Sequence, residues 1–168
     1  MNLNKIPQGE LVLIDANIFI YALQKQSRQC IQLLQRCAED QVIGYIADNI
    51  LAEIMHTLMI AEARDNNWIS GPNPARQLSE QPQRVSALLR YESLLRDILG
   101  MGLRLESLQR EDFLTALTVQ RQSGLLTNDA LLVAMALRLR IQSIVSADQA
   151  LNRVQGVMVY SPDDLKMD

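Results

Sequence analysis

The aliphatic run Leu11-Val12-Leu13-Ile14 is followed directly by Asp15. Such an unbroken aliphatic run is typical of a strand buried on both faces of a parallel sheet. Similar short runs recur and predict four further strands, over residues 42–46, 102–105, 142–145 and 157–160.

The segments between these runs have the apolar spacing of helices. Helices are expected over residues 18–38, 50–64, 84–99, 108–122 and 129–140. The last is apolar almost all round, so we expect it to be well buried. The alternation of strands and helices predicts an α/β fold, a three-layer sandwich with a central, mainly parallel five-stranded sheet.

The chain of 168 residues, 48% hydrophobic and 21% charged, has the length and composition of one globular domain over residues 1–168. Residues 65–83 break the helical pattern and hold three of the five prolines. We expect this segment to be a loop or insertion, and to be mobile, because few apolar residues anchor it.

Neither a membrane span nor a signal peptide is expected, because no apolar run is long enough and residues 1–10 lack an apolar core. The expected location is therefore the cytoplasm. Cys30 and Cys37 lie seven residues apart in a predicted helix, about 10 Å from each other, which is too far for a disulfide. Their spacing indicates packing in the core.

The net charge of −3 argues against the broad basic face of a typical nucleic-acid-binding protein. The cations are mostly arginine, since lysine occurs only at Lys5, Lys25 and Lys166. Guanidinium groups suit bidentate contacts with phosphate. For any single arginine, a solvated helix face remains the simpler interpretation.

Four acidic residues are placed to meet at one edge of the predicted sheet. Asp15 follows the first strand and Asp148 follows the fourth. Glu53 is expected in the first turn of the helix after the second strand, and Asp129 begins the helix before the fourth. Because ligands bind beyond the carboxyl ends of parallel strands, this edge is the expected site.

Each acid alone has a simpler explanation, because Asp and Glu are favoured in the first turn of a helix. However, Asp48, Asn49 and Asn128 are expected to cap two of these helices, which leaves Glu53 and Asp129 partly surplus. Four crowded carboxylates need a cation to remain ionised. Hard oxygen ligands favour Mg²⁺ or Mn²⁺, ions that suit phosphodiester hydrolysis.

Each of the four acids lies in a short motif: Leu13-Ile-Asp15-Ala-Asn17-Ile-Phe, Leu51-Ala-Glu53-Ile, Thr127-Asn-Asp129-Ala-Leu-Leu-Val-Ala and Val145-Ser-Ala-Asp148. In their order along the chain, these motifs resemble the PIN-domain ribonucleases, above all the VapC-type toxins of bacterial toxin-antitoxin pairs. The resemblance implies a metal-dependent endoribonuclease with RNA as substrate and Mg²⁺ or Mn²⁺ as cofactor. It also implies that Asp15, Glu53 and Asp129 are the core acids and Asp148 the fourth.

The same resemblance implies supporting residues and partners. Asn17 and Ser146 match polar positions that support the family's site, although ordinary turn chemistry explains them equally well. His56 shares a helix face with Glu53, but an incidental histidine is expected. A homodimer and an antitoxin protein are the expected partners. The predicted helix over 84–99 is a candidate interface, while core packing explains most of its apolar residues.

Two other enzyme classes fit the sequence poorly. A dinucleotide-binding enzyme needs a glycine-rich turn after the first strand, and no glycine follows Asp15 there. A phosphatase with an aspartyl nucleophile would be expected to have its second acid where Asn17 stands. The remaining alternative is a catalytically idle PIN-like binding or regulatory module.

Overall fold

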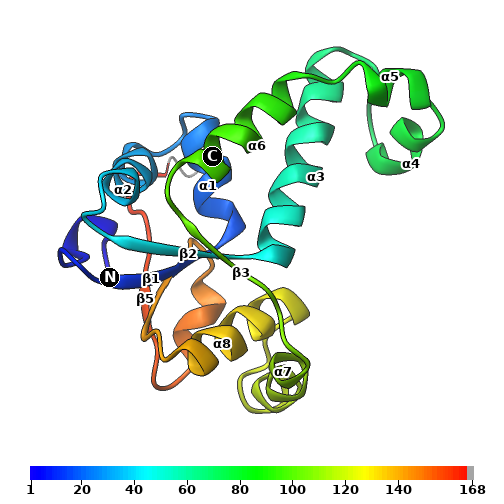
Figure 1. The fold of residues 1–168 in the computed structure, drawn as a ribbon. Helices are drawn as coiled ribbons and strands as arrows, with labels where there is room; N and C mark the ends of the chain where they lie inside the picture. Colours follow the sequence, from blue (N-terminus) through cyan, green and yellow to red (C-terminus); the bar gives the residue numbers. More distant parts are fainter. Residues whose placement is uncertain (166–168) are drawn as a thin grey trace.

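One sheet of five parallel strands runs through the middle of the molecule, between two layers of helices (Figure 1). The computed structural model describes residues 1–165 and confirms the predicted α/β sandwich and all five strands. The strand order is β3-β2-β1-β4-β5. The strands are β1 (Leu11–Ile14), β2 (Ile43–Ala47), β3 (Arg104–Glu106), β4 (Ser143–Val145) and β5 (Met158–Tyr160).

The helices lie on both faces of this sheet, and two of them extend well beyond it (Figure 1). One face carries α1 (Ala16–Leu23), α2 (Arg28–Ala38), α3 (Asp48–Asp65) and α6 (Arg90–Gly100). The other carries α7 (Arg110–Ser123) and α8 (Thr127–Leu139). Two short helices, α4 (Pro74–Ser79) and α5 (Pro82–Ser86), lie at the far end of α3. The short 3₁₀ helices are η1 (Leu3–Lys5) and η2 (Gln149–Arg153).

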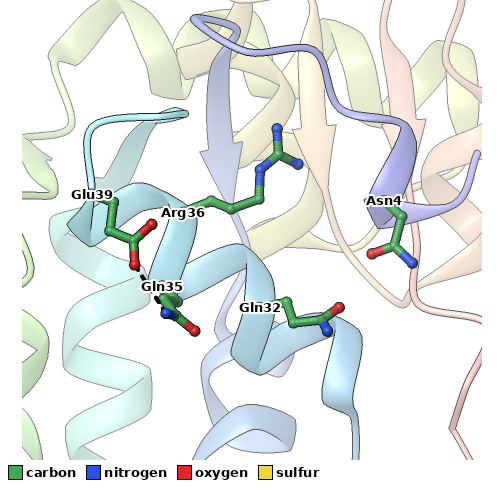
Figure 2. Close-up of a pocket in the computed structure, with 5 residues that line it drawn as sticks. All are labelled: Asn4, Gln32, Gln35, Arg36 and Glu39. Atoms are coloured by element: carbon green, nitrogen blue, oxygen red, sulfur yellow. Dashed lines mark hydrogen bonds between the residues drawn. The ribbon is translucent and has the colours of Figure 1, made fainter.

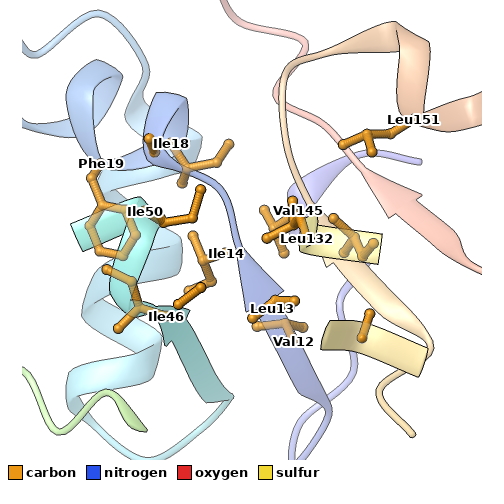
Figure 3. Close-up of a cluster of buried hydrophobic side chains, with 14 of the residues drawn as sticks. Val12, Leu13, Ile14, Ile18, Phe19, Ile46, Ile50, Leu132, Val145 and Leu151 are labelled. Atoms are coloured by element: carbon orange, nitrogen blue, oxygen red, sulfur yellow. The ribbon is translucent and has the colours of Figure 1, made fainter. Parts of the chain in front are cut away.

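The central strand β1 is covered on both of its faces. Leu13 and Ile14 are completely buried, and successive side chains of a strand point to opposite faces. Figure 3 shows Ile14 beside Phe19 and Ile50, and Leu13 near Leu132 of α8. The uninterrupted aliphatic run of β1 is therefore explained by a helix layer on each side.

Helix α2 packs closely on the sheet at Gly44. A Cβ atom at Gly44 would lie 2.6 Å from Leu103 Cδ2 and 3.1 Å from Cys37 Sγ. Cys30 and Cys37 are both buried free cysteines, as predicted, and burial raises the pKa of each thiol to about 11. They serve as small apolar groups in this interface.

The helix predicted over 18–38 is wrong as a single element, because the chain turns between α1 and α2. Lys25 has a left-handed backbone, with φ of 58°. Ser27 then caps α2, its hydroxyl accepting a hydrogen bond from the Cys30 amide at 3.0 Å. The apolar spacing continues across the turn because both helices face the same core.

The segment 65–83 contains helices rather than an irregular loop. Together with neighbouring residues it forms a small hydrophobic cluster of its own, which we call the tip cluster: Ala63, Ile69, Leu78 and Leu88. Ile69 and Leu78 of the segment 65–83 are anchored in this cluster, and the mobility of the segment stays a prediction. The helix predicted over 84–99 is also divided, between α5 and α6.

Within residues 1–165, none of the helices combines the length and the apolar character that crossing a membrane requires.

Candidate active site

Asp15 lies at the junction between β1 and α1, where its carboxylate is held by three donors. One oxygen accepts the Ala16 amide at 2.7 Å, so Asp15 caps α1. The other accepts hydrogen bonds from Asn17 Nδ2 and Ser146 Oγ, both at 2.6 Å. Asp15 is 9% exposed. Burial raises its pKa, although the hydrogen bonds act in the opposite direction.

Asn17 and Ser146 connect this junction to the end of β4. Asn17 Nδ2 also donates to Ser146 Oγ at 3.0 Å, and its Oδ1 accepts the Ala147 amide at 3.0 Å. The buried Ser146 hydroxyl accepts the Asp148 amide at 3.0 Å. The network fixes the Asp15 carboxylate in one orientation and joins the loops that carry Asp15 and Asp148.

Asp129 is the acid with the most strongly perturbed proton affinity at this edge. It lies in the first turn of α8 and is partly buried. Its pKa is raised to about 6, first by burial and then by the negative charges of Asp148, Asp15 and Glu53. Asp129 therefore senses all three of the other predicted acids, and the fold brings the four carboxylates near one another.

Glu53 and Asp148 are the exposed members of the group. Glu53 lies in the second turn of α3, one turn later than predicted, and accepts a hydrogen bond from Asn128 Nδ2 at 2.8 Å. Asp148 caps η2 through the Ala150 amide at 2.7 Å. Both carboxylates are thus held by protein donors at the rim of the site.

The donor set suits a hard cation, because it consists of carboxylate oxygens crowded by like charge. Among residues 1–165, however, no three acidic, histidine or cysteine side chains are already grouped closely enough to hold one ion. Glu53 and Asp148 each use one carboxylate oxygen in the hydrogen bonds described above, which leaves the other oxygen of each for an ion.

The predicted caps of the two site helices are confirmed only in part. The cap positions of α3 and α8 are Ala47 and Leu126, and neither provides a side-chain hydrogen bond. Asp48, the first residue of α3, does accept one free amide of that helix, from Asn49 at 2.8 Å, and also the Leu108 amide at 3.3 Å, across to the segment that follows β3. The predicted asparagine caps are wrong because each helix begins just before these residues.

Two asparagines that the sequence suggested only as caps have other surroundings. Asn128 bonds Glu53 rather than the start of α8. Both polar atoms of the Asn49 side chain are buried without a hydrogen-bond partner. The one available signal was their position in the chain, next to Asp129 and four residues before Glu53. His56 is exposed on α3.

A polar hollow of about 370 Å³ lies elsewhere on the surface, beside α2 and η1 (Figure 2). Its lining includes Arg36 and Glu39 but none of the four acids. Arg36 donates to the Ile6 carbonyl at 2.7 Å, and the segment after Glu39 leads into β2 at the amino end of the strands. This hollow is therefore separate from the candidate active site.

Solved structures with the same fold come from several organisms. VapBC2 from Rickettsia felis, bound to a DNA fragment from their promoter, has a TM-score of 0.57 at 16% identity, covering 91% of this chain and 99% of that one. A toxin-antitoxin complex from Klebsiella pneumoniae has 0.55 at 17% identity, covering 88% and 95%. FitAcB from Neisseria gonorrhoeae has 0.55 at 16% identity, covering 89% and 96%.

No curated protein sequence matches this chain significantly. At these low identities, the structural similarities establish the fold alone. The sequence profile of the PIN domain, in contrast, matches residues 12–157, which is most of the chain and includes all four acids. This chain therefore belongs to the PIN-domain family.

Proposed function

We propose that this protein is an endoribonuclease that depends on Mg²⁺ or Mn²⁺ and acts through Asp15, Glu53, Asp129 and Asp148. The observation that carries the proposal is the placement of these acids at one edge of the sheet, in a chain whose PIN-domain match covers all four of them. The raised pKa of Asp129 supports it, because it reflects burial together with the negative charges of the other three acids. A nuclease has a use for such a cluster, whereas a purely structural role would leave this repulsion uncompensated.

Asp15 and Asp129 would form the inner part of the site, because both are less exposed than Glu53 and Asp148. Asn17 and Ser146 would keep the Asp15 carboxylate in one orientation through the bonds described above. Glu53 and Asp148 would complete the set of ligands from the rim. The bound ion would activate water and stabilise charge on the attacked phosphate.

The main alternative is a PIN-like module that binds a partner without cutting RNA. A cleavage assay on single-stranded and structured RNA, with Mg²⁺, Mn²⁺ or EDTA, separates the two. We expect cleavage with either ion and none in EDTA. Asp15→Asn and Asp129→Asn should each reduce the rate by roughly 100-fold or more, since each removes a preorganised charge.

The matched control is Asp97→Asn, which removes one exposed acid from α6, a helix that carries none of the four acids. It should cleave at the parent rate. Circular dichroism should give the same folded spectrum for all four proteins. Full cleavage by the parent in EDTA, or by Asp129→Asn with metal, would contradict the proposal.

A homodimer and an antitoxin-like partner are part of the same proposal. One of the similar structures is a toxin-antitoxin complex. In the helix predicted over 84–99, Leu88 and Ile98 are buried, whereas Leu89 and Leu99 are 69% and 53% exposed and remain candidates. A second candidate is the outer face of α7, where three large apolar side chains are 51–58% exposed within about one turn: Phe113, Leu114 and Leu117.

Light scattering at micromolar concentration tests the dimer. For the parent we expect the dimer mass, which is twice the chain mass of 19.0 kDa. For Leu117→Asp we expect a shift towards the monomer mass of 19.0 kDa, because the variant places a charge in the apolar face. A parent that is monomeric throughout this range would exclude the dimer.

A further inference from the structure

Asn49 holds the only buried side-chain nitrogen or oxygen atoms without a hydrogen-bond partner among residues 1–165. Both atoms of its carboxamide, Nδ2 and Oδ1, are in this condition. Buried polar groups in folded proteins almost always have a partner, and one without a partner makes the fold less stable. Asn49 therefore needs an explanation that its local structure does not supply.

Helix capping does not explain it. Asn49 is the second residue of α3, after the cap position Ala47. Its own amide donates to Asp48 Oδ1 at 2.8 Å, but this bond leaves its side chain unused. Asparagine is also a poor helix former compared with alanine or leucine. Neither local structure nor helix propensity favours it here.

The position of Asn49 points towards the carboxylates. It precedes Glu53 by four residues, so the two side chains lie on the same flank of α3, one turn apart. Asp48, about 100° further round the helix, faces Leu108 on the side of β3. Strand β2, which leads into α3, pairs with β1 in the register Leu13↔Tyr45. The ends of these two strands, just before Asp15 and Asp48, therefore lie side by side.

We infer that the Asn49 carboxamide is a positioning group of the proposed site, which hydrogen-bonds a water molecule carried by the metal ion. The inference rests on the proposed function. A carboxamide offers both a donor and an acceptor, and Mg²⁺ keeps several waters when carboxylates bind it. Both atoms are shielded from water in this conformation, so the contact requires the carboxamide to turn towards the ion.

If Asn49 has this role, replacing it should raise the stability of the metal-free protein and weaken its binding of Mn²⁺. Asn49→Leu keeps the size of the side chain and removes both unpaired atoms, so the metal-free protein should melt several degrees higher. The same variant should bind Mn²⁺ about 10-fold more weakly, the usual loss for a residue that orients metal ligands. A residue with a merely structural role would not change the two quantities in opposite directions.

The experiment compares the parent, Asn49→Leu, Asn49→Ala and the control Asn66→Leu. Asn66 is exposed at the other end of α3, so the same chemical change there should leave Mn²⁺ binding unchanged. Thermal melts in EDTA give stability, calorimetric titration gives the Mn²⁺ dissociation constant, and a fluorescent single-stranded RNA gives cleavage. If leucine prevents folding, Asn49→Ala carries the test.

The outcomes separate this inference from the proposed function. Higher melting together with weaker Mn²⁺ binding in the Asn49 variants supports it. A parent that binds Mn²⁺ and cleaves RNA, with Asn49 variants that bind Mn²⁺ equally well, overturns the role of Asn49 alone. A parent that neither binds Mn²⁺ nor cleaves RNA overturns the proposed function and this inference with it.

Discussion

Two acids that are shielded from solvent have pKa values shifted in opposite directions. Glu62 lies between α3 and α6, and Asp129 lies at the edge of the sheet. Glu62 is only 7% exposed. Burial alone would raise its pKa, but the amides of Tyr91, Arg90 and Leu89, which donate to its carboxylate at 2.7–3.1 Å, hold the pKa below its usual value. Asp129 has a pKa raised to about 6.

The difference lies in what surrounds each carboxylate. Glu62 meets the free amides at the start of α6, which stabilise its charge and which it caps in turn. Asp129 meets three other acids, and no hydrogen bond contributes to its shift. The charge of the first acid is compensated within the fold, whereas the charge of the second is opposed by its neighbours.

Glu62→Ala should be the most damaging change, because it leaves three amides at the start of α6 without their acceptor. We expect a loss of about 3 kcal/mol in the free energy of unfolding, or a melting point lower by about 6–12 °C. At temperatures below its own melting point, the variant should still cleave RNA. In the control Glu92→Ala, which removes an exposed partner of Arg96, the loss should stay below about 1 kcal/mol. If the two variants melted at the same temperature, the hydrogen bonds of Glu62 would contribute no more to stability than an exposed ion pair.

Mg²⁺ should raise the melting point of the parent, because a ligand that binds only the native state stabilises it by mass action. At about 100 times the dissociation constant the gain is about 2.7 kcal/mol. Asp129→Asn should gain less, since it has lost one carboxylate. Melts in EDTA and in millimolar Mg²⁺ measure both. An equal gain in the two proteins would mean that Asp129 does not bind the ion.

The pH dependence of stability in EDTA should carry opposite signs for the two acids. The raised pKa of Asp129 means that its contribution is complete below 3.8, its usual value, and is lost as the pH rises to about 6. The lowered pKa of Glu62 means that its contribution is complete above its usual value of 4.5 and is lost as the pH falls.

Asp129→Asn should therefore melt higher than the parent at pH 7.5 in EDTA and about equally at pH 4. Because the Asp129 side chain is partly solvated, screening reduces the effect to about 1 kcal/mol, or roughly 2–4 °C. A difference that stays constant between the two pH values would show that repulsion is not its cause.

Arg84→Ala should have the smallest effect. Arg84 lies over the Trp68 ring at 5.6 Å and donates to the Trp68 carbonyl at 3.0 Å, which holds α5 against the tip cluster. The cation–π contact is worth about 0.5–1 kcal/mol. Trp68 is the only tryptophan, so its fluorescence should shift to longer wavelength in the variant. An unchanged spectrum would mean that the ring does not sense Arg84.

The sequence by itself determined the strands and the edge at which the acids lie. The strands are short aliphatic runs with two buried faces, which is a local property of the chain. Parallel strands all end at the same edge, so Asp15 and Asp148 had to lie there once the strands were recognised. The positions of Glu53 and Asp129 followed from the helices on either side.

Only the tertiary structure decided which polar groups are paired, because those contacts join residues far apart in sequence. The acceptor for the start of α6 comes from Glu62, and the partner of Glu53 is Asn128, 75 residues away. The tip cluster gathers four residues that show no common periodicity. The unpaired amide of Asn49 is visible only once the surrounding elements cover it. Periodicity reports the burial of a residue, but hydrogen bonding and charge depend on which neighbours the fold supplies.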